Sequence, residues 1–157
     1  MAGSTEAAHT KLIAQNRKAR HDYAIEEAFE AGLVLVGTEV KACREGKASL
    51  ADAYALVEED EAWLMQCHIS PYSHGNKANH EPMRPRKLLL HRSEIERIKV
   101  ATSQQGRTVI PLRLYFKHGI AKAEIAIARG KKTYDRRHDM AERDAERRMR
   151  RELGRRR

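Results

Sequence analysis

The sequence predicts a mostly β protein, in which a small antiparallel β-barrel carries short peripheral helices and a basic C-terminal tail that is disordered or helical. About five or six runs rich in branched and aromatic residues recur without the regular strand and helix alternation of a parallel sheet. Two pairs of these runs are joined by connections of hairpin length. The 157 residues suffice for one domain with a single core.

The N-terminal part predicts a flexible start, a short helix and a bent strand. Residues 1–11 are small and polar, as in a mobile lead-in. Apolar residues recur at helical spacing over residues 23–31, and Gly32 stands where such a helix would stop. Residues 33–43 carry branched side chains around Gly37, which predicts a strand with a glycine bend or bulge.

The middle of the chain predicts a hairpin, a long loop and a second helix. Residues 53–57 and 62–69 are strand-like runs joined by a short acidic turn. Residues 70–86 hold three of the four prolines, so we expect a long loop there. Ser93 and Glu96 match a capping box, which predicts that a helix starts at Ser93.

A second hairpin completes the predicted barrel. That helix should end before Gly106, after which residues 108–116 and 120–129 form two further strand-like runs. Pro111 has no backbone N–H for a strand ladder, so it predicts an edge or a bulge. An OB-like barrel over residues 12–129 is the natural candidate for these elements.

Most of the net charge of +9 lies in the C-terminal segment. Residues 129–157 contain 13 Lys and Arg against 6 Asp and Glu, whereas residues 1–128 contain 18 against 16. Clustered Lys and Arg gain affinity for polyanions by releasing counterions from phosphates, so nucleic acid is the first candidate partner. Binding to an anionic membrane is disfavoured, because the tail offers only a thin apolar stripe.

The tail itself, residues 130–157, is predicted to change its conformation on binding. Residues 139–154 can place Ala141, Ala145, Met149 and Leu153 in one i, i+4 stripe, but an isolated helix of that length is marginal in water. We therefore expect disorder in the free protein and a helix along an RNA-lined surface. A charged tail that remains solvated is the alternative.

The sequence also bounds the location and the chemistry of the protein. It has no basic N-terminal region followed by an apolar run and no stretch near the ~20 apolar residues of a membrane span, so we expect a cytoplasmic protein. Cys43 and Cys67 lack CxxC spacing, which predicts reduced, partly buried thiols instead of a disulfide framework or a zinc ribbon. No cofactor and no metal are expected.

Six segments of the chain carry a recognisable ordered pattern, namely residues 13–23, 25–33, 37–41, 47–52, 86–90 and 128–137. In order and spacing they resemble the SmpB family of SsrA-binding proteins. The resemblance implies an OB-fold barrel that binds the tRNA-like domain of transfer-messenger RNA, also called SsrA RNA, and brings it to stalled ribosomes for trans-translation. It implies a non-enzymatic protein without a small-molecule substrate. Its tail would probe the empty mRNA channel below the decoding site of the small subunit.

Carried over by motif position, Asn16, Glu30 and Leu89 are implied contacts to the RNA. Asparagine offers donors and an acceptor, and a carboxylate accepts from exocyclic amines or a 2′-hydroxyl. A solvated glutamate and a core leucine are the alternatives for Glu30 and Leu89. Further cationic residues could hold phosphates without reading sequence. They are Arg17, Lys18, Lys41, Arg44, Lys47, Arg86 and Lys87.

The junction between barrel and tail is the implied ribosome contact. Its predicted residues are Lys131, Lys132, Tyr134, Asp135, Arg136 and Arg137. An aromatic ring flanked by cations, as at Tyr134, stacks on unpaired bases with about 1–3 kcal/mol per base. The alternative for Tyr134 is packing back on the barrel.

Two other classes of function compete with this interpretation. A generic single-strand or ribosomal RNA-binding OB protein would need exposed aromatic platforms, but only 5% of the residues are aromatic. Several of these aromatic residues stand in apolar runs and are expected to face the core, namely Phe29, Trp63, Tyr115 and Phe116. A metal enzyme would have to use Cys67, His68, His74 and His80, whose spacing matches no compact zinc motif.

Overall fold

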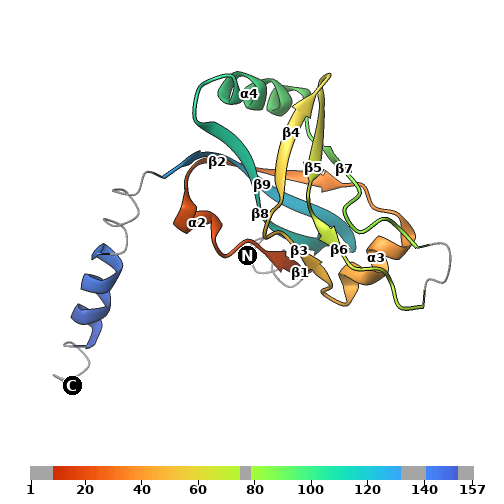
Figure 1. The fold of residues 1–157 in the computed structure, drawn as a ribbon, viewed down its shortest axis with the longest axis horizontal. Helices are drawn as coiled ribbons and strands as arrows, with labels where there is room; N and C mark the ends of the chain where they lie inside the picture. Colours follow the sequence, from red (N-terminus) through yellow and green to blue (C-terminus); the bar gives the residue numbers. More distant parts are fainter. Residues whose placement is uncertain (1–8, 75–78, 132–140, 152–157) are drawn as a thin grey trace.

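The structure is a computed structural model, and it describes residues 9–74, 79–131 and 141–151. The described residues form nine strands and three short helices in the body of the protein (Figure 1). The helices are α2 (Ala19–Asp22), α3 (Gly37–Arg44) and α4 (Arg92–Thr102). The strands are β1 (Thr10–Gln15), β2 (Tyr23–Leu33), β3 (Ala48–Ser49), β4 (Tyr54–Glu58), β5 (Glu61–Met65), β6 (His68–Ile69), β7 (Arg86–Leu89), β8 (Arg107–Lys117) and β9 (Ile120–Gly130).

Six of the strands close into an antiparallel barrel. Their order is β8, β4, β5, β7, β2 and β9, and β9 pairs again with β8. The other edge of β8 is shared, because β4 pairs with it at Val109 and β1 pairs with it between Arg113 and Lys117. Closure of this kind removes unpaired strand edges from the sheet. The predicted mostly β antiparallel fold is confirmed.

The helix predicted over residues 23–31 is wrong, since this segment belongs to β2. It pairs with β9 from Tyr23 to Gly32, with a register shift between Ile25 and Glu27. Phe29 packs into the core inside the barrel, whereas Ile25 packs against a second cluster outside it. The strand thus buries apolar side chains on both of its faces, and the bulge between them produces a spacing that imitates a helix.

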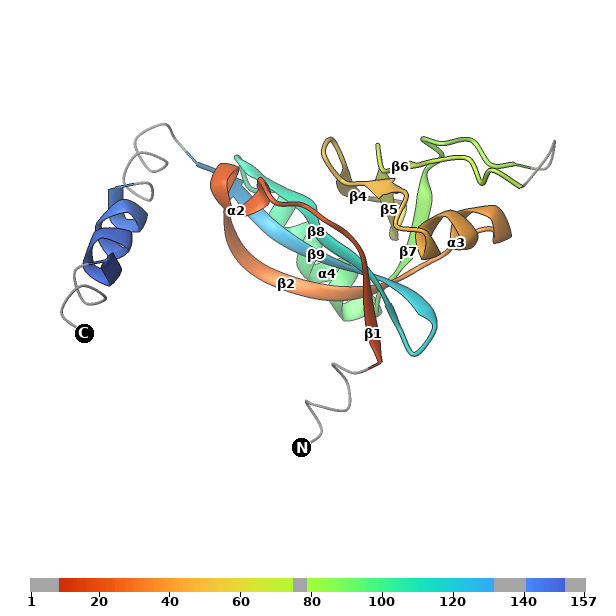
Figure 2. The ribbon, with the colours of Figure 1, turned by 90° about the horizontal axis from the view of Figure 1, so that it is seen from below.

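The second cluster packs on the outer side of the sheet under α2. It contains Ala19, Ile110, Leu112, Ala126 and Ala128. Figure 2 shows α2 at one end of the long strands β2, β8 and β9. Because β8 and β9 are covered on both faces there, they are rich in apolar residues up to Arg107 and Arg129, a cross-strand pair at the strand ends.

The prediction of a strand over residues 33–43 is also wrong, except at Leu33, which ends β2. Gly37 begins α3, and the Glu39 carboxylate accepts a hydrogen bond of 2.9 Å from the backbone N–H of Val36. Ala42 and Cys43 face the core from this helix. Branched side chains favour strands only weakly, and a satisfied helix start with a buried face outweighs that preference here.

Both predicted hairpins are confirmed, but the strand predicted over residues 62–69 breaks at Gln66, whose φ is 57°, into β5 and β6, and β6 pairs with β3. Glu59 and Asp60 between β4 and β5 have positive φ values of 51° and 62°, as a two-residue hairpin turn of type I′ requires. Pro111 lies where the register of β8 against β9 shifts, so its predicted bulge is confirmed. Helix α4 begins at Arg92 and not at the predicted Ser93, because Glu94 accepts from the backbone N–H of His91 at 2.9 Å.

The tail is described only in part. Residues 141–151 are helical and exposed. The predicted disorder of the free tail stays a prediction. No helix in the described ranges is long and apolar enough to cross a membrane.

Candidate nucleic-acid interface

Strands β7, β2, β9 and β8 present a face on the outside of the barrel. Their alternate residues, such as Leu88, Phe29 and Leu114, belong to the inner core. The residues between them point outward, and we call this set the outer face. It consists of Glu30, Gly32, Leu89, Arg113, Tyr115, Lys117, Lys122 and Glu124. The register aligns it in cross-strand rows, so that side chains from four strands are neighbours.

Leu89 lies at one edge of the outer face and is not a core residue. Its side chain is 54% exposed, and its partner across the strands is Gly32. A Cβ atom on Gly32 would stand 3.2 Å from Cβ and 3.4 Å from Cδ1 of Leu89. The glycine therefore leaves room for the leucine to lie against β2. An apolar side chain held at the surface in this way is suited to contact a base or a ribose.

Glu30 lies on the outer face of β2 as an ionised acceptor. The hydroxyl of Tyr115 donates a hydrogen bond to Glu30 Oε2, and Lys117 Nζ lies 3.6 Å from Oε1. The Tyr115 hydrogen bond is the main cause that holds the pKa of Glu30 below its usual range, and the charges of Lys117 and Lys122 act in the same direction. Because the Glu30 side chain is 40% exposed, its carboxylate is accessible to a partner.

Asn16 anchors the end of β1 to β8. Its Nδ2 donates to the carbonyl oxygen of Pro111 at 3.1 Å, and its backbone N–H donates to that of Leu112 at 2.8 Å. Leu112 and Tyr115 are three residues apart on β8, which corresponds to about 10 Å along a strand. Asn16 thus lies beside β8, the strand whose Tyr115 bonds to Glu30. It also lines two cavities of about 420 Å³ each, together with Lys18.

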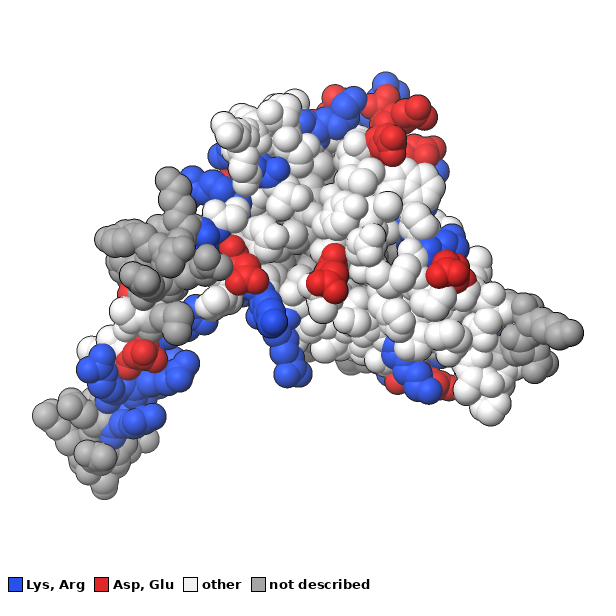
Figure 3. Space-filling model, in the orientation of Figure 1, with Lys and Arg blue, Asp and Glu red and all other residues white. Residues whose placement is uncertain are grey.

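The predicted phosphate contacts do not form one cluster. Arg17 and Lys18 are exposed between β1 and α2. Lys41, Arg44 and Lys47 are exposed on α3 and just after it, where the Lys41 ammonium lies 5.5 Å from the centre of the Tyr72 ring and Lys47 Nζ lies 3.1 Å from Glu45 Oε2. Lys87 Nζ lies 3.4 Å from Glu61 Oε1. Figure 3 shows Lys and Arg in several separate groups on the face that it draws.

The prediction that Arg86 contacts a phosphate is wrong, because Arg86 is fully buried. Its Nε donates to Glu39 Oε2 at 2.6 Å, and its other nitrogens donate to the carbonyl oxygens of Cys67 and Pro82. The alternation of β7 places Arg86 and Leu88 inside and leaves Leu89 outside. Period-2 alternation within the segment could have separated these roles in the sequence.

Sequence reasoning missed the polar half of the outer face. Arg113, Tyr115 and Lys117 alternate with core residues in β8, and this period-2 pattern was the available signal. Tyr115 is buried, as predicted, but it lies on the outer side of the sheet and not in the core. The predicted ribosome contacts Lys132, Tyr134, Asp135, Arg136 and Arg137 lie outside the described residues.

Lys131 fixes the point where the tail leaves the barrel. Its backbone N–H donates to the carbonyl oxygen of Asp22 at 2.9 Å. Its Nζ donates to the carbonyl oxygen of Arg20, also at 2.9 Å. The start of the tail is therefore tied to α2, and through α2 to the outer cluster beneath it.

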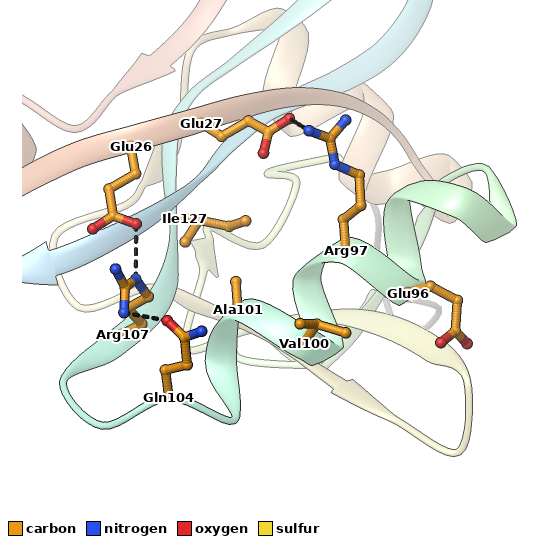
Figure 4. Close-up of a pocket in the computed structure, with 9 residues that line it drawn as sticks. All are labelled: Glu26, Glu27, Glu96, Arg97, Val100, Ala101, Gln104, Arg107 and Ile127. Atoms are coloured by element: carbon orange, nitrogen blue, oxygen red, sulfur yellow. Dashed lines mark hydrogen bonds and ion pairs between the residues drawn. The ribbon is translucent and has the colours of Figure 1, made fainter.

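A cavity of about 520 Å³ lies between α4 and the strands β2 and β9 (Figure 4). Its charged rim is internally paired. Arg107 Nε lies 2.8 Å from Glu26 Oε2, and Arg97 lies 2.7 Å from Glu27 Oε1. With its cations neutralised by glutamates, this cavity does not favour a polyanion.

The possible metal ligands do not converge. His80 is buried and bonds through its two ring nitrogens to the Thr38 hydroxyl and the Ile69 carbonyl oxygen, at 2.8 Å each. Burial raises the pKa of the Cys67 thiol to about 11 and that of Cys43 to about 12, which keeps both protonated. Among residues 9–74, 79–131 and 141–151, no group of His, Cys, Asp and Glu side chains is placed to hold a metal ion.

Comparison with known proteins gives consistent matches. The family described as SmpB protein matches residues 13–155. The SsrA-binding protein of Thermobifida fusca (strain YX) is 59% identical over 147 residues, covering 94% of this chain and 92% of the relative. That of Parafrankia sp. (strain EAN1pec) is 59% identical over 145 residues, covering 92% of each. A solved chain described as "tmRNA-SmpB: a journey to the center of the bacterial ribosome" matches with a TM-score of 0.65 and 47% identity, covering 76% of this chain and 84% of that one.

Proposed function

The chain belongs to the SmpB family, and on this basis we propose that it binds transfer-messenger RNA and delivers it to stalled ribosomes for trans-translation. The observation that carries the proposal is the outer face. It sets an ionised acceptor at Glu30 and an exposed apolar side chain at Leu89 on one rigid sheet, with Lys117 and Lys122 beside them. Folded RNA is recognised by such contacts to unstacked bases, ribose hydroxyls and phosphates.

The proposed division of labour follows from the positions of these groups. Glu30 accepts from the RNA, Leu89 packs on it, and Asn16 adds its remaining amide capacity from the adjacent edge of β8. Exposed cations around the barrel supply phosphate contacts that fix orientation without reading sequence. In this role are Arg17, Lys18, Lys41, Arg44, Lys47 and Lys87.

The tail supplies the second half of the proposed function. Residues 130–157 enter the empty mRNA channel near the decoding site, and Lys131 ties the start of this segment to α2. Lys132, Tyr134, Asp135, Arg136 and Arg137 are the proposed contacts to the ribosome. The protein acts as an adapter in the cytoplasm, without catalysis of its own.

A generic single-strand RNA binder is the second candidate, and the aromatic residues argue against it. Phe29, Tyr115 and Phe116 are buried. The expectation that Trp63 faces the core is wrong, because it is half-buried and alternates along β5 with the core residues Ala62 and Leu64. Tyr54 is 38% exposed but does not belong to the outer face. The described part of the chain therefore offers no row of rings on which successive bases would stack.

A reconstituted rescue assay tests the proposal. Ribosomes stalled at the end of an mRNA without a stop codon are mixed with transfer-messenger RNA, with or without the purified full-length protein. We expect the nascent chain to gain the peptide encoded by that RNA only when the protein is present. If the peptide is added equally without the protein, or not at all with it, the proposed function is wrong.

A further inference from the structure

Tyr115 occupies an unusual place for a buried tyrosine. It is 3% exposed, yet it stands on the outer face, between the core residues Leu114 and Phe116 that point the other way. Its cross-strand partner on β1 is Leu12, and charged side chains lie beside it on β8. The guanidinium of Arg113 lies over the ring, 4.4 Å from its centre, and Lys117 flanks it on the same side of β8.

Tyr115 contacts both the Glu30 carboxylate and the Arg113 guanidinium. Its hydroxyl donates to Glu30 Oε2, while its ring face carries Arg113. Arg113 also lies 3.5 Å from Glu124 Oε1, and Glu124 is the cross-strand partner of both Glu30 and Arg113. One buried side chain therefore fixes an acceptor and a cation side by side at the surface.

From this geometry we propose that Tyr115 is a positioning residue for RNA recognition, which orients Glu30 toward a donor of the RNA and Arg113 toward an adjacent phosphate. The inference rests on the proposed function and adds two residues to the binding site. The tyrosine hydroxyl occupies Oε2 and Lys117 Nζ lies 3.6 Å from Oε1, so Glu30 presents the remaining acceptor capacity of Oε1 to an N–H or O–H donor, such as an exocyclic amine. Arg113, preorganised on the ring, presents its free edge to a phosphate oxygen.

The electrostatics of the site agree with an acceptor-only carboxylate. The hydrogen bond from Tyr115 is the largest cause of the lowered pKa of Glu30, and burial raises the pKa of Tyr115 itself, so that its hydroxyl remains a donor. Other charged groups that face Glu30 from β8 and β9 are Lys117, Lys122 and Glu124. Loss of the tyrosine hydroxyl should therefore raise the pKa of Glu30.

The test uses Tyr115→Phe in the full-length protein, because phenylalanine keeps the ring under Arg113 and removes only the hydroxyl. We expect the affinity for transfer-messenger RNA at pH 7 to fall about three- to tenfold. As the pH is lowered, binding by Tyr115→Phe should weaken at a higher pH than binding by wild type, because its Glu30 becomes protonated earlier. A purely structural role of the hydroxyl would lower the melting temperature without shifting this pH profile.

A double-mutant cycle separates this inference from the proposed function. In a Glu30→Ala background, Tyr115→Phe should cause no further loss of affinity, because the carboxylate that it orients is gone. The plot of log K against log salt concentration has a negative slope. Arg113→Gln should reduce the steepness of this slope by about 1, whereas Arg92→Gln on α4 should leave it unchanged.

Two results would overturn the positioning role while leaving the proposed function intact. One is selective binding that Glu30→Ala weakens and Tyr115→Phe does not. The other is a loss on Tyr115→Phe that is equally large in the Glu30→Ala background. If wild type itself shows no preference for transfer-messenger RNA, the proposed function fails, and the positioning role fails with it.

Discussion

Replacement of Glu39 by alanine should lower the free energy of unfolding by about 3–5 kcal/mol, because it leaves the fully buried Arg86 guanidinium without its counter-charge. Glu39 accepts from Arg86 Nε at 2.6 Å, from Arg84 at 2.5 Å and from the Val36 backbone N–H at 2.9 Å. One carboxylate thus joins the start of α3 to the loop before β7. The measurement is equilibrium unfolding in urea at pH 7.

The matched control for this prediction is Glu27→Ala. Glu27 forms an ion pair of 2.7 Å with Arg97, but their side chains are 37% and 64% exposed, so its loss should cost only about 0–1 kcal/mol. Replacing Glu39 and Arg86 together by methionine should recover much of the stability lost by Glu39→Ala, since neither buried charge then remains. An equal, small effect of Glu39→Ala and Glu27→Ala would contradict the structural role of Glu39.

The pH dependence of wild-type stability has a definite sign at this site. Burial alone would raise the pKa of Glu39, but the donors from Arg84, Val36 and Arg86 outweigh burial and lower it below its ordinary value of 4.5. A lowered carboxyl pKa stabilises the fold above the pKa of the unfolded chain. This contribution is lost as the pH falls below about 4.5 toward the folded-state pKa, and the Glu39→Ala variant should lack that part of the acid dependence.

Truncation after His138 should abolish rescue of stalled ribosomes while leaving binding to transfer-messenger RNA largely intact. The outer face and the anchor of the tail at Lys131 both lie before the cut, so the barrel and its proposed RNA contacts are preserved. The removed part includes the helical residues 141–151, which are exposed and rich in arginine. The measurements are RNA affinity and addition of the encoded peptide in the reconstituted assay.

A tail with the same residues in scrambled order is the control for charge. It keeps the composition, the length and the net charge of residues 139–157, but it breaks the i, i+4 stripe of Ala141, Ala145 and Met149. If the tail acts as a helix in the channel, the scrambled tail should rescue poorly. Normal rescue by the truncated protein would show that the tail is dispensable and would remove it from the proposed mechanism.

The sequence predicted the C-terminal half of the barrel better than the N-terminal half. The hairpin of β8 and β9 was predictable, because Lys122 and Glu124 alternate with apolar residues over residues 121–125 and Pro111 marks the bulge. Strand β2 was not predictable from the sequence, because Ile25 and Phe29 pack into clusters on opposite sides of the sheet, and their spacing resembles that of a helix. Only tertiary packing distinguishes such a strand from an amphipathic helix.

The candidate site was likewise predicted in part. Motif position pointed to Glu30 and Leu89, and the structure places both on the outer face. Motif position could not point to Tyr115, because the proposed role of Tyr115 depends on a hydrogen bond to Glu30, a residue 85 positions earlier in the chain. Arg86 was assigned to the surface because cations are usually exposed, and the rule failed where Glu39 supplies a buried counter-charge.

The central claim is that the outer face recognises folded RNA by specific contacts and not by charge alone. The most direct test compares the affinities of wild type, Glu30→Ala and Glu58→Ala for transfer-messenger RNA, with tRNA and unstructured RNA as competitors, across a salt series. Glu58 is an exposed glutamate on β4, so both variants remove one negative charge. We predict that Glu30→Ala lowers the affinity for transfer-messenger RNA roughly tenfold and that Glu58→Ala leaves it unchanged or raises it. Equal binding of all RNAs, unaffected or strengthened by Glu30→Ala, would contradict recognition through the outer face.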